Sequence, residues 1–171
     1  MANAASSRIK QLMAEESAQK TDIAAGKNLT GILLIVWIAT RLALYISEVV
    51  CAGFGYIDSS VTASMLNIVT VLIGGLFALC IYSGVRLFAI LPIIGGVLML
   101  AQCFTYGYFS IALSADYYMA ARVYAALFVI ASAAQTVIMI FLLANKKTRA
   151  YFDAYKRVSE TVIKEKSVEL N

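Results

Sequence analysis

Four long runs of apolar residues constrain the fold of this chain more than any other feature of its sequence. The runs cover about 29–50, 61–83, 87–111 and 120–144. A helix of about 20 apolar residues is long enough to cross the hydrocarbon core of a bilayer, which is about 30 Å thick. Short connections between the runs favour antiparallel neighbours. The sequence therefore predicts an all-α integral membrane protein, with four transmembrane helices in an up-down-up-down bundle.

Charged residues are scarce, and most of them lie in the two terminal segments. They make up 14% of the 171 residues, whereas a soluble domain carries about a quarter. Between positions 29 and 144 the only charged residues are Arg41, Glu48, Asp58, Arg86, Asp116 and Arg122. A soluble protein could not solvate so apolar a middle, so the composition argues against a soluble domain.

Basic residues flank the apolar runs on one side of the predicted membrane. They are Arg8, Lys10, Lys20 and Lys27 before the first run, Arg86 between the second and third, and Lys146, Lys147 and Arg149 after the fourth. The two outer connections carry no lysine or arginine between the runs. Because cytoplasmic loops are enriched in basic residues, both termini are predicted to be cytoplasmic.

This layout divides the chain into three segments. Residues 1–28 are predicted to form a polar, amphipathic cytoplasmic helix, 29–144 the four-helix transmembrane domain, and 145–171 a basic amphipathic cytoplasmic tail. The compact loops and the lack of disulfide spacing favour a plasma membrane, by default a bacterial inner membrane.

The sequence offers no constellation of residues for catalysis or metal binding. It contains no histidine, which removes the commonest general base and metal ligand. Its three cysteines, Cys51, Cys80 and Cys103, show no C-x-x-C spacing. We therefore expect no enzyme activity, no cofactor and no metal.

Two glycine pairs predict how the second and third spans meet. Counted outward from the turn between these spans, Gly74 and Gly75 lie at the same depth as Gly95 and Gly96. Small residues let helix backbones approach closely in lipid. The sequence therefore predicts a tight hairpin with the glycine pairs facing each other.

A group of polar residues predicts a pocket in the outer half of the membrane. Arg41 lies near the middle of the first span, and Tyr45 and Glu48 follow it on the same helix face. Asn67 and Gln102 lie at nearly the same depth on the next two spans. Taken alone, Glu48 lies close to the outer surface and is expected to be solvated.

Two interpretations of Arg41 remain open. In the first, Arg41 bonds to carbonyls or amides of neighbouring spans, such as Gln135, and fixes how the helices pack. In the second, Arg41 and the other polar residues line an outward-facing pocket that holds an anion or a polar head group. An intramembrane charge is costly and usually faces protein or water, which fits both interpretations.

Both terminal segments show helical patterns. Residues 6–25 predict a helix that stops at Gly26. In the tail, apolar residues recur at the helical positions Tyr151, Tyr155, Val158 and Val162. The basic residues beside this apolar stripe are Lys146, Lys147, Arg149, Lys156 and Arg157. Such a helix is predicted to lie on anionic head groups at the inner membrane surface, although it could also continue the fourth span into the cytosol.

The segment from Leu142 to Phe152, with the sequence LLANKKTRAYF, ends the fourth span in a short basic stretch followed by aromatic residues. This order of features resembles four-span families of bacterial inner-membrane proteins of unknown function. The resemblance implies a four-span membrane fold and no particular activity.

These observations predict a small accessory or scaffold component of the membrane. The alternative is a small-solute or ion transporter that works as a homodimer around Arg41. An enzyme acting on lipid head groups is a third and weaker hypothesis. The expected partners are the bilayer, its anionic inner head groups, and either a second copy or a larger membrane complex. The small surplus of basic residues does not favour nucleic acid as a partner.

Overall fold

Every element in the described part of the chain is a helix. The computed structural model describes the backbone of residues 2–55 and 61–169, and the side chains of 5–55, 68–165 and 167. The elements are α1 (Ala2–Gln19), α2 (Thr21–Gly53), α3 (Val61–Tyr82), the 3₁₀-helix η1 (Arg86–Ala89), α4 (Ile90–Thr105), α5 (Tyr108–Leu113), α6 (Met119–Ala144) and α7 (Lys146–Glu169). The all-helical part of the predicted fold class is confirmed.

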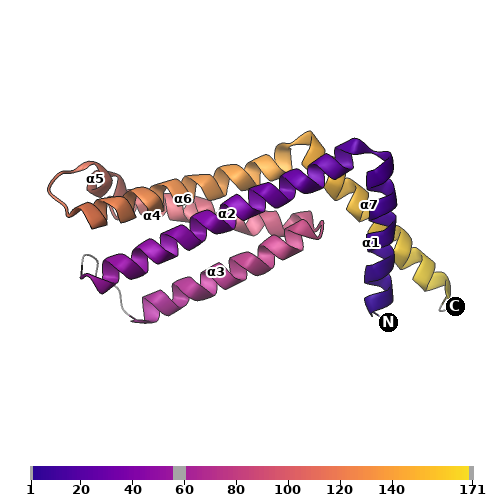
Figure 1. Ribbon diagram of the computed structural model, residues 1–171, viewed down its shortest axis with the longest axis horizontal. Helices are drawn as coiled ribbons and strands as arrows, with labels where there is room; N and C mark the ends of the chain where they lie inside the picture. The colour runs from indigo at the N-terminus through magenta and orange to yellow at the C-terminus, as the bar shows by residue number, and fades with distance from the viewer. Residues whose placement is uncertain (1, 56–60, 170–171) are drawn as a thin grey trace.

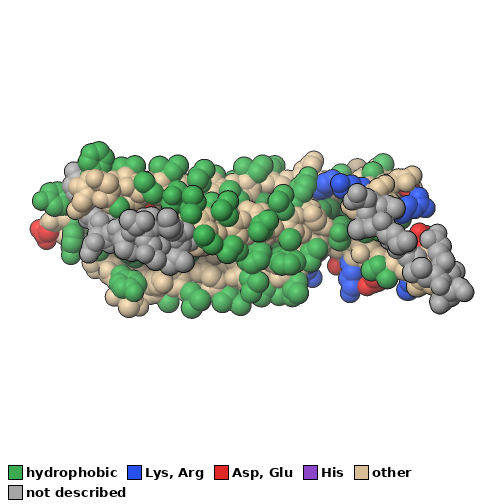
Figure 2. Space-filling model, turned by 90° about the horizontal axis from the view of Figure 1, so that it is seen from below, with side chains coloured by type: hydrophobic (Ala, Val, Ile, Leu, Met, Phe, Trp, Pro, Cys, Tyr) green, Lys and Arg blue, Asp and Glu red, His purple; other side chains and the backbone are tan. Residues whose placement is uncertain are grey.

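The four long apolar helices α2, α3, α4 and α6 run lengthwise, and α1 and α7 lie together at one end of them (Figure 1). Both termini lie at that end. We call the pair formed by α1 and α7 the cap. Charged side chains gather on the cap, whereas apolar side chains cover the long body of the molecule (Figure 2).

Three helices are long and apolar enough to cross a membrane. They are Thr21–Gly53, Arg86–Thr105 and Met119–Ala144. The described apolar part of α3, Ile68–Tyr82, is shorter. Apolar side chains such as Ile35 point outward from the body, where water would make their exposure costly. These are the features of a membrane protein.

The first apolar helix begins earlier than predicted. Lys20 has an extended backbone, which separates α1 from α2, and α2 then continues without a break through Gly26. The expected stop at Gly26 is therefore wrong. A side chain at Gly26 would collide with the carbonyl of Lys147, so the glycine serves the close approach of α2 and α7.

The third predicted span, 87–111, is divided into three pieces. Its start is the 3₁₀-helix η1, and Pro92 then lies in the first turn of α4, where a missing N–H is tolerated. Its end differs from the prediction, because Gly107 has the left-handed backbone conformation (φ 66°) and interrupts the helix before α5. Hydropathy alone did not reveal this turn, since apolar residues continue on both sides of it.

The glycines of α4 pack against α6 instead of α3. A side chain at Gly96 would collide with the hydroxyl of Thr136, and one at Gly95 would lie 3.2 Å from Nε2 of Gln135. Among the described residues, α4 packs mainly on α6 and α3 mainly on α2, and α3 otherwise touches η1 beside the turn. The predicted glycine hairpin is therefore wrong in its partners, although Gly96 does permit close helix packing.

The glycines of α3 differ from each other in their surroundings. A side chain at Gly74 would meet Trp37 and Ile38 of α2 at about 3.8 Å, which is ordinary contact. A side chain at Gly75 would meet nothing within 4 Å. Depth from a turn does not determine which way a helix is rotated, and here the rotation brings Gly74 onto α2.

Gln135 joins three helices at the centre of the body. Its Oε1 accepts a hydrogen bond from Nε1 of Trp37 on α2 (3.3 Å), and its Nε2 donates one to the carbonyl of Pro92 on α4 (2.6 Å). Trp37 and Gln135 are both almost fully buried. With both ends of its amide in use, Gln135 is a packing residue and not the partner of Arg41.

The helix α7 packs on protein through its apolar stripe. Tyr151, Phe152, Val158 and Val162 are buried, and α7 contacts both α2 and α1. The prediction that the stripe lies on lipid head groups is therefore wrong. It failed because α1 and the start of α2 cover that face.

The helix α7 is also not a straight continuation of α6. Asn145 has an extended backbone between the two helices. Its side-chain oxygen accepts a hydrogen bond from the N–H of Lys147 (2.9 Å), as an N-cap residue does. The chain therefore turns at Asn145 and begins a new helix there.

Two aromatic contacts fasten α7 to the turn between α3 and η1. The hydroxyl of Tyr151 donates a hydrogen bond to the carbonyl of Tyr82. Burial raises the pKa of Tyr151 to about 12. The ring of Tyr155 lies against Gly84, whose left-handed backbone (φ 93°) and missing side chain leave room for it.

Candidate functional site

A cavity with both polar and apolar lining residues lies between the four long helices. Its volume is about 370 Å³, which is within the range of small-molecule sites. The lining residues are Arg41, Leu44, Tyr45 and Glu48 of α2, Thr70 and Val71 of α3, Gly95, Leu98, Met99 and Gln102 of α4, and Tyr124 and Phe128 of α6. We call this the Arg41 cavity.

The structure brings four of the five predicted pocket residues to this cavity. Arg41, Tyr45 and Glu48 reach it together because positions i, i+4 and i+7 share one helix face. Gln102 reaches it from α4. The side chain of Asn67 lies outside the described residues. The cavity is thus a fact of the geometry, and its use as a binding site remains a prediction.

Arg41 is poorly satisfied by the described part of the protein. Its Nη1 donates a hydrogen bond to the thioether sulfur of Met99 (3.1 Å), and its buried Nε has no acceptor. A thioether is a weak acceptor, whereas a guanidinium carries five donors. At 1.5 Å per residue, Arg41 lies about 21 Å along α2 from Lys27 and about 18 Å from Gly53. Its charge is therefore placed deep in the apolar body.

Glu48 is only 8% exposed, so the expectation that it would be solvated is wrong. Neighbouring helices bury it, and it lies in the lining of the same cavity as Arg41. Seven residues of helix separate the two, a rise of about 10 Å. The cavity therefore has a basic part near the middle of α2 and an acidic part nearer the Gly53 end of α2.

The aromatic lining residues Tyr124 and Phe128 of α6 are backed by Tyr108 of α5, which does not itself line the cavity. The rings of Tyr108 and Phe128 lie 4.7 Å apart, and Tyr108 meets Tyr124 edge-on at 6.1 Å. The turn at Gly107 makes this possible, because it folds α5 back against α6. This cluster closes the wall behind Glu48 with apolar surface.

The lining residues of the cavity differ in exposure between the helices. Leu44, Glu48 and Tyr124, which belong to α2 and α6, are buried. Thr70 of α3 and Gln102 of α4 are exposed lining residues. Since α2 and α6 pack together while α3 and α4 pack outward from them, the first pair forms the floor and the second pair the rim.

Several lining residues were missed in the sequence. Met99 lies three residues before Gln102, and Gly95 lies seven before it, so all three share the helix face of Gln102. That spacing could have identified them. Tyr124 and Phe128 are also four residues apart, but nothing in the sequence indicates that their face meets Arg41.

A second cavity lies at the base of the cap, with a volume of about 440 Å³. Its charged lining residues are Lys20, Asp22, Asp153 and Arg157. Arg157 forms an exposed ion pair with Glu16 (3.3 Å), so its charge already has a partner. Mixed, exposed and partly paired charges give this cavity no distinct ligand chemistry.

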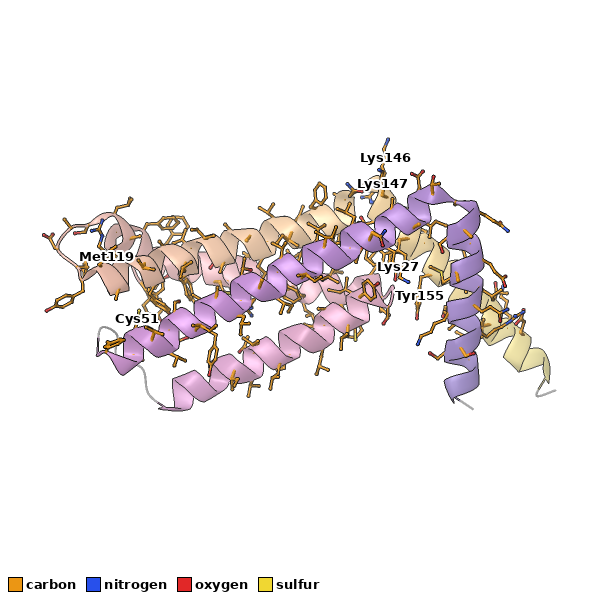
Figure 3. The ribbon with its side chains drawn as sticks, viewed as in Figure 1. Lys27, Cys51, Met119, Lys146, Lys147 and Tyr155 are labelled. Carbon is orange, nitrogen blue, oxygen red and sulfur yellow. The ribbon has the colours of Figure 1, made fainter. Side chains whose placement is uncertain are left out.

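Five basic side chains surround the junction between the apolar body and the cap. All five, Lys27, Arg86, Lys146, Lys147 and Arg149, are exposed. Lys27, Lys146 and Lys147 lie near Tyr155 at this end of the molecule, whereas Cys51 and Met119 lie at the other end (Figure 3). We call these five residues the basic collar.

No group of three or more histidine, cysteine, aspartate or glutamate side chains that could hold a metal ion occurs among the described residues. Comparison with profiles of known protein families finds no match. Comparisons with curated proteins and with solved structures likewise find none. The function of this chain is therefore inferred from the arrangement of its own residues.

Proposed function

We propose that the chain is a four-span protein of the plasma membrane, by default a bacterial inner membrane, with both termini in the cytoplasm. The helix α3 supports a fourth span, since its 22 residues rise about 33 Å. The basic collar supports the orientation, because exposed lysine and arginine are favoured on the cytoplasmic side. The collar then lies at the level of the inner head groups, where each basic residue contributes about 1 kcal/mol of attraction to anionic lipid.

Its proposed role is that of an accessory component without catalysis of its own. The observation that carries this proposal is the cap, which is fastened to the cytoplasmic end of the body through Gly26, Gly84 and Tyr151. In such a rigid cap, the outer faces of α1 and α7 would form a fixed polar surface that contacts a larger membrane complex. Membrane contact of Lys156 and Arg157, which are exposed on α7, remains part of this proposal.

The size of the native complex in mild detergent tests the accessory role. Val158→Asp places a charge in the buried stripe and should undock α7, whereas Val158→Ala keeps the same buried position apolar. We expect the wild type and Val158→Ala to migrate in a complex larger than a dimer, and Val158→Asp to leave that complex. A wild-type protein that migrates as a monomer or dimer would refute the accessory role.

A second candidate function is transport of a small solute or ion, favoured by the Arg41 cavity. Residues of one chain form this cavity, so a binding site would not depend on a homodimer. Reconstituted wild type should then move an anion such as phosphate across vesicles, and Arg41→Gln should fold but lose this flux. Equal flux in wild type and Arg41→Gln would exclude transport of that ion through the cavity.

A further inference from the structure

The side chain of Arg41 has an unfilled requirement for an acceptor. Its described hydrogen bond is to the sulfur of Met99, and its buried Nε has none. An arginine at the centre of a membrane helix costs at least about 2.5 kcal/mol. Gln135, the amide that could have satisfied Arg41 from α6, is already bonded to Trp37 and Pro92. The Nε–H of Arg41 is therefore available to donate a hydrogen bond to a group that enters the cavity.

The cavity next to Arg41 has space for such a group. A phosphate or carboxylate can accept two parallel hydrogen bonds from the planar guanidinium fork. Tyr45 and Gln102 add a hydroxyl and an amide to the lining. Glu48 lies about 10 Å further along the helix and would disfavour an anion in the outer part of the cavity. The charges therefore select a position beside Arg41.

The exposed rim residues of the cavity indicate how a ligand would enter. Thr70 of α3 and Gln102 of α4 are exposed rim residues. The visible surface of the body is otherwise mostly apolar (Figure 2). In the proposed orientation this rim faces the lipid. A polar amide there is costly against hydrocarbon but favourable beside a polar head group.

We propose that the Arg41 cavity binds an anionic oxygen group, a phosphate or a carboxylate, that is seated on Arg41 and admitted between α3 and α4. Such a binding site is compatible with an accessory protein and with a transporter. The inference rests on the proposed membrane-spanning arrangement. The group could belong to a lipid head group or to a free anion, which share this chemistry. The two sources differ in route, because a lipid enters from the side and a free ion enters with water.

Thermal unfolding in an uncharged detergent tests the proposal. The single tryptophan, Trp37, is 1% exposed and reports unfolding by its fluorescence. The probes are inorganic phosphate, at constant ionic strength against chloride, and short-chain phosphatidylglycerol, against the uncharged diacylglycerol of the same chain length. The variants are Arg41→Gln, Arg41→Lys and the control Arg8→Gln, which removes an exposed charge of α1 outside the basic collar.

We expect at least one probe to raise the Tm of the wild type and of Arg8→Gln by several degrees. Its apparent affinity should fall at least tenfold in Arg41→Gln and also fall in Arg41→Lys, which keeps the charge but loses the fork. A response to phosphate would indicate a free anion, and a response to phosphatidylglycerol alone would indicate a lipid. No response to either probe, or equal responses in wild type and the Arg41 variants, would overturn the proposal.

If Arg41→Gln does not fold, the comparison of Arg41→Lys with Arg8→Gln tests the proposal in the same way. The membrane arrangement is tested separately by reporter fusions at the two termini and at the connections between helices. If the fusions contradict the predicted topology but binding still depends on Arg41, the membrane arrangement is rejected and the anion site is kept. If the fusions agree with the topology but binding does not depend on Arg41, only the anion site is rejected.

Discussion

Replacement of Gln135 by leucine should destabilise the body by about 1–3 kcal/mol. Gln135 is 2% exposed and bonds to both Trp37 and the carbonyl of Pro92. Interhelical hydrogen bonds in membrane proteins average about 0.6 kcal/mol, with a maximum of about 1.7. Leucine has a similar size, so the loss of packing is small. The loss arises because the tryptophan N–H and the proline carbonyl both remain buried without a partner.

The two hydrogen bonds should contribute unequally. The bond to Pro92 is 2.6 Å long and the bond from Trp37 is 3.3 Å long, so we expect most of the loss from the contact between α6 and α4. A double-mutant cycle with Trp37→Phe isolates the smaller part, expected at or below about 0.6 kcal/mol. Because the cycle removes the tryptophan, circular dichroism should follow unfolding in detergent. A Gln135→Leu variant as stable as the wild type would refute the three-helix junction.

Three further predictions concern the cap and its attachment. Gly84→Ala should lower the free energy of unfolding by about 2–4 kcal/mol, because alanine is strained in the left-handed conformation and its side chain would overlap the adjacent ring of Tyr155. Gly107 also has the left-handed conformation but has open space around it, so Gly107→Ala should lower the free energy of unfolding by only about 1–2 kcal/mol in the same assay. Burial raises the pKa of Tyr151 from 10 to about 12, so the protonated side chain stabilises the docking of α7 below pH 10, and this stabilisation is lost as the pH rises to 12. Protease cleavage of α7 should therefore increase between pH 10 and 12. The Tyr151→Phe variant should show a weaker dependence of cleavage on pH. Arg157→Ala breaks an exposed ion pair with Glu16 and should change the free energy of unfolding by less than about 1 kcal/mol; a larger loss would show that this pair holds the cap.

The face of α2 that lines the cavity was predictable from the sequence. Arg41, Tyr45 and Glu48 have helical spacing, and helical periodicity is reliable inside a long apolar run. The depth of Gln102 was also predictable by counting from a turn. Periodicity does not show which helix packs against each face. The contact of Arg41 with Met99 and the position of Tyr124 in the cavity wall were therefore not predicted.

The helix neighbours could not be derived from chain order. Consecutive helices in a short-looped bundle usually pack together, and the equal depth of the glycine pairs in α3 and α4 agrees with that rule. In the structure, side-chain fit decides instead, because Gly96 admits Thr136 and Gln135 reaches Pro92. Such matches depend on helix rotation, which hydropathy and depth do not determine.

The same limit explains the errors at the ends of helices and in the tail. Glycine often ends helices, which favours a stop at Gly26, yet the role of Gly26 is to admit the carbonyl of Lys147. The apolar stripe of α7 was correctly identified as one helix face, but lipid and protein are equally good apolar partners for such a face. Only the position of α1 and α2 resolves that choice, and they bury Val158.

The packing also indicates which wall of the Arg41 cavity can give way. The amide of Gln135 and the close contact of Gly96 with Thr136 hold α2, α4 and α6 together. Within the described residues, α3 packs mainly on α2 and also contacts η1, and the carbonyl of its last residue, Tyr82, accepts a hydrogen bond from Tyr151 of α7. None of the contacts that join Gln135 to Trp37 and Pro92, or Gly96 to Thr136, involves α3. A group that enters between α3 and α4 therefore need not break the three-helix junction.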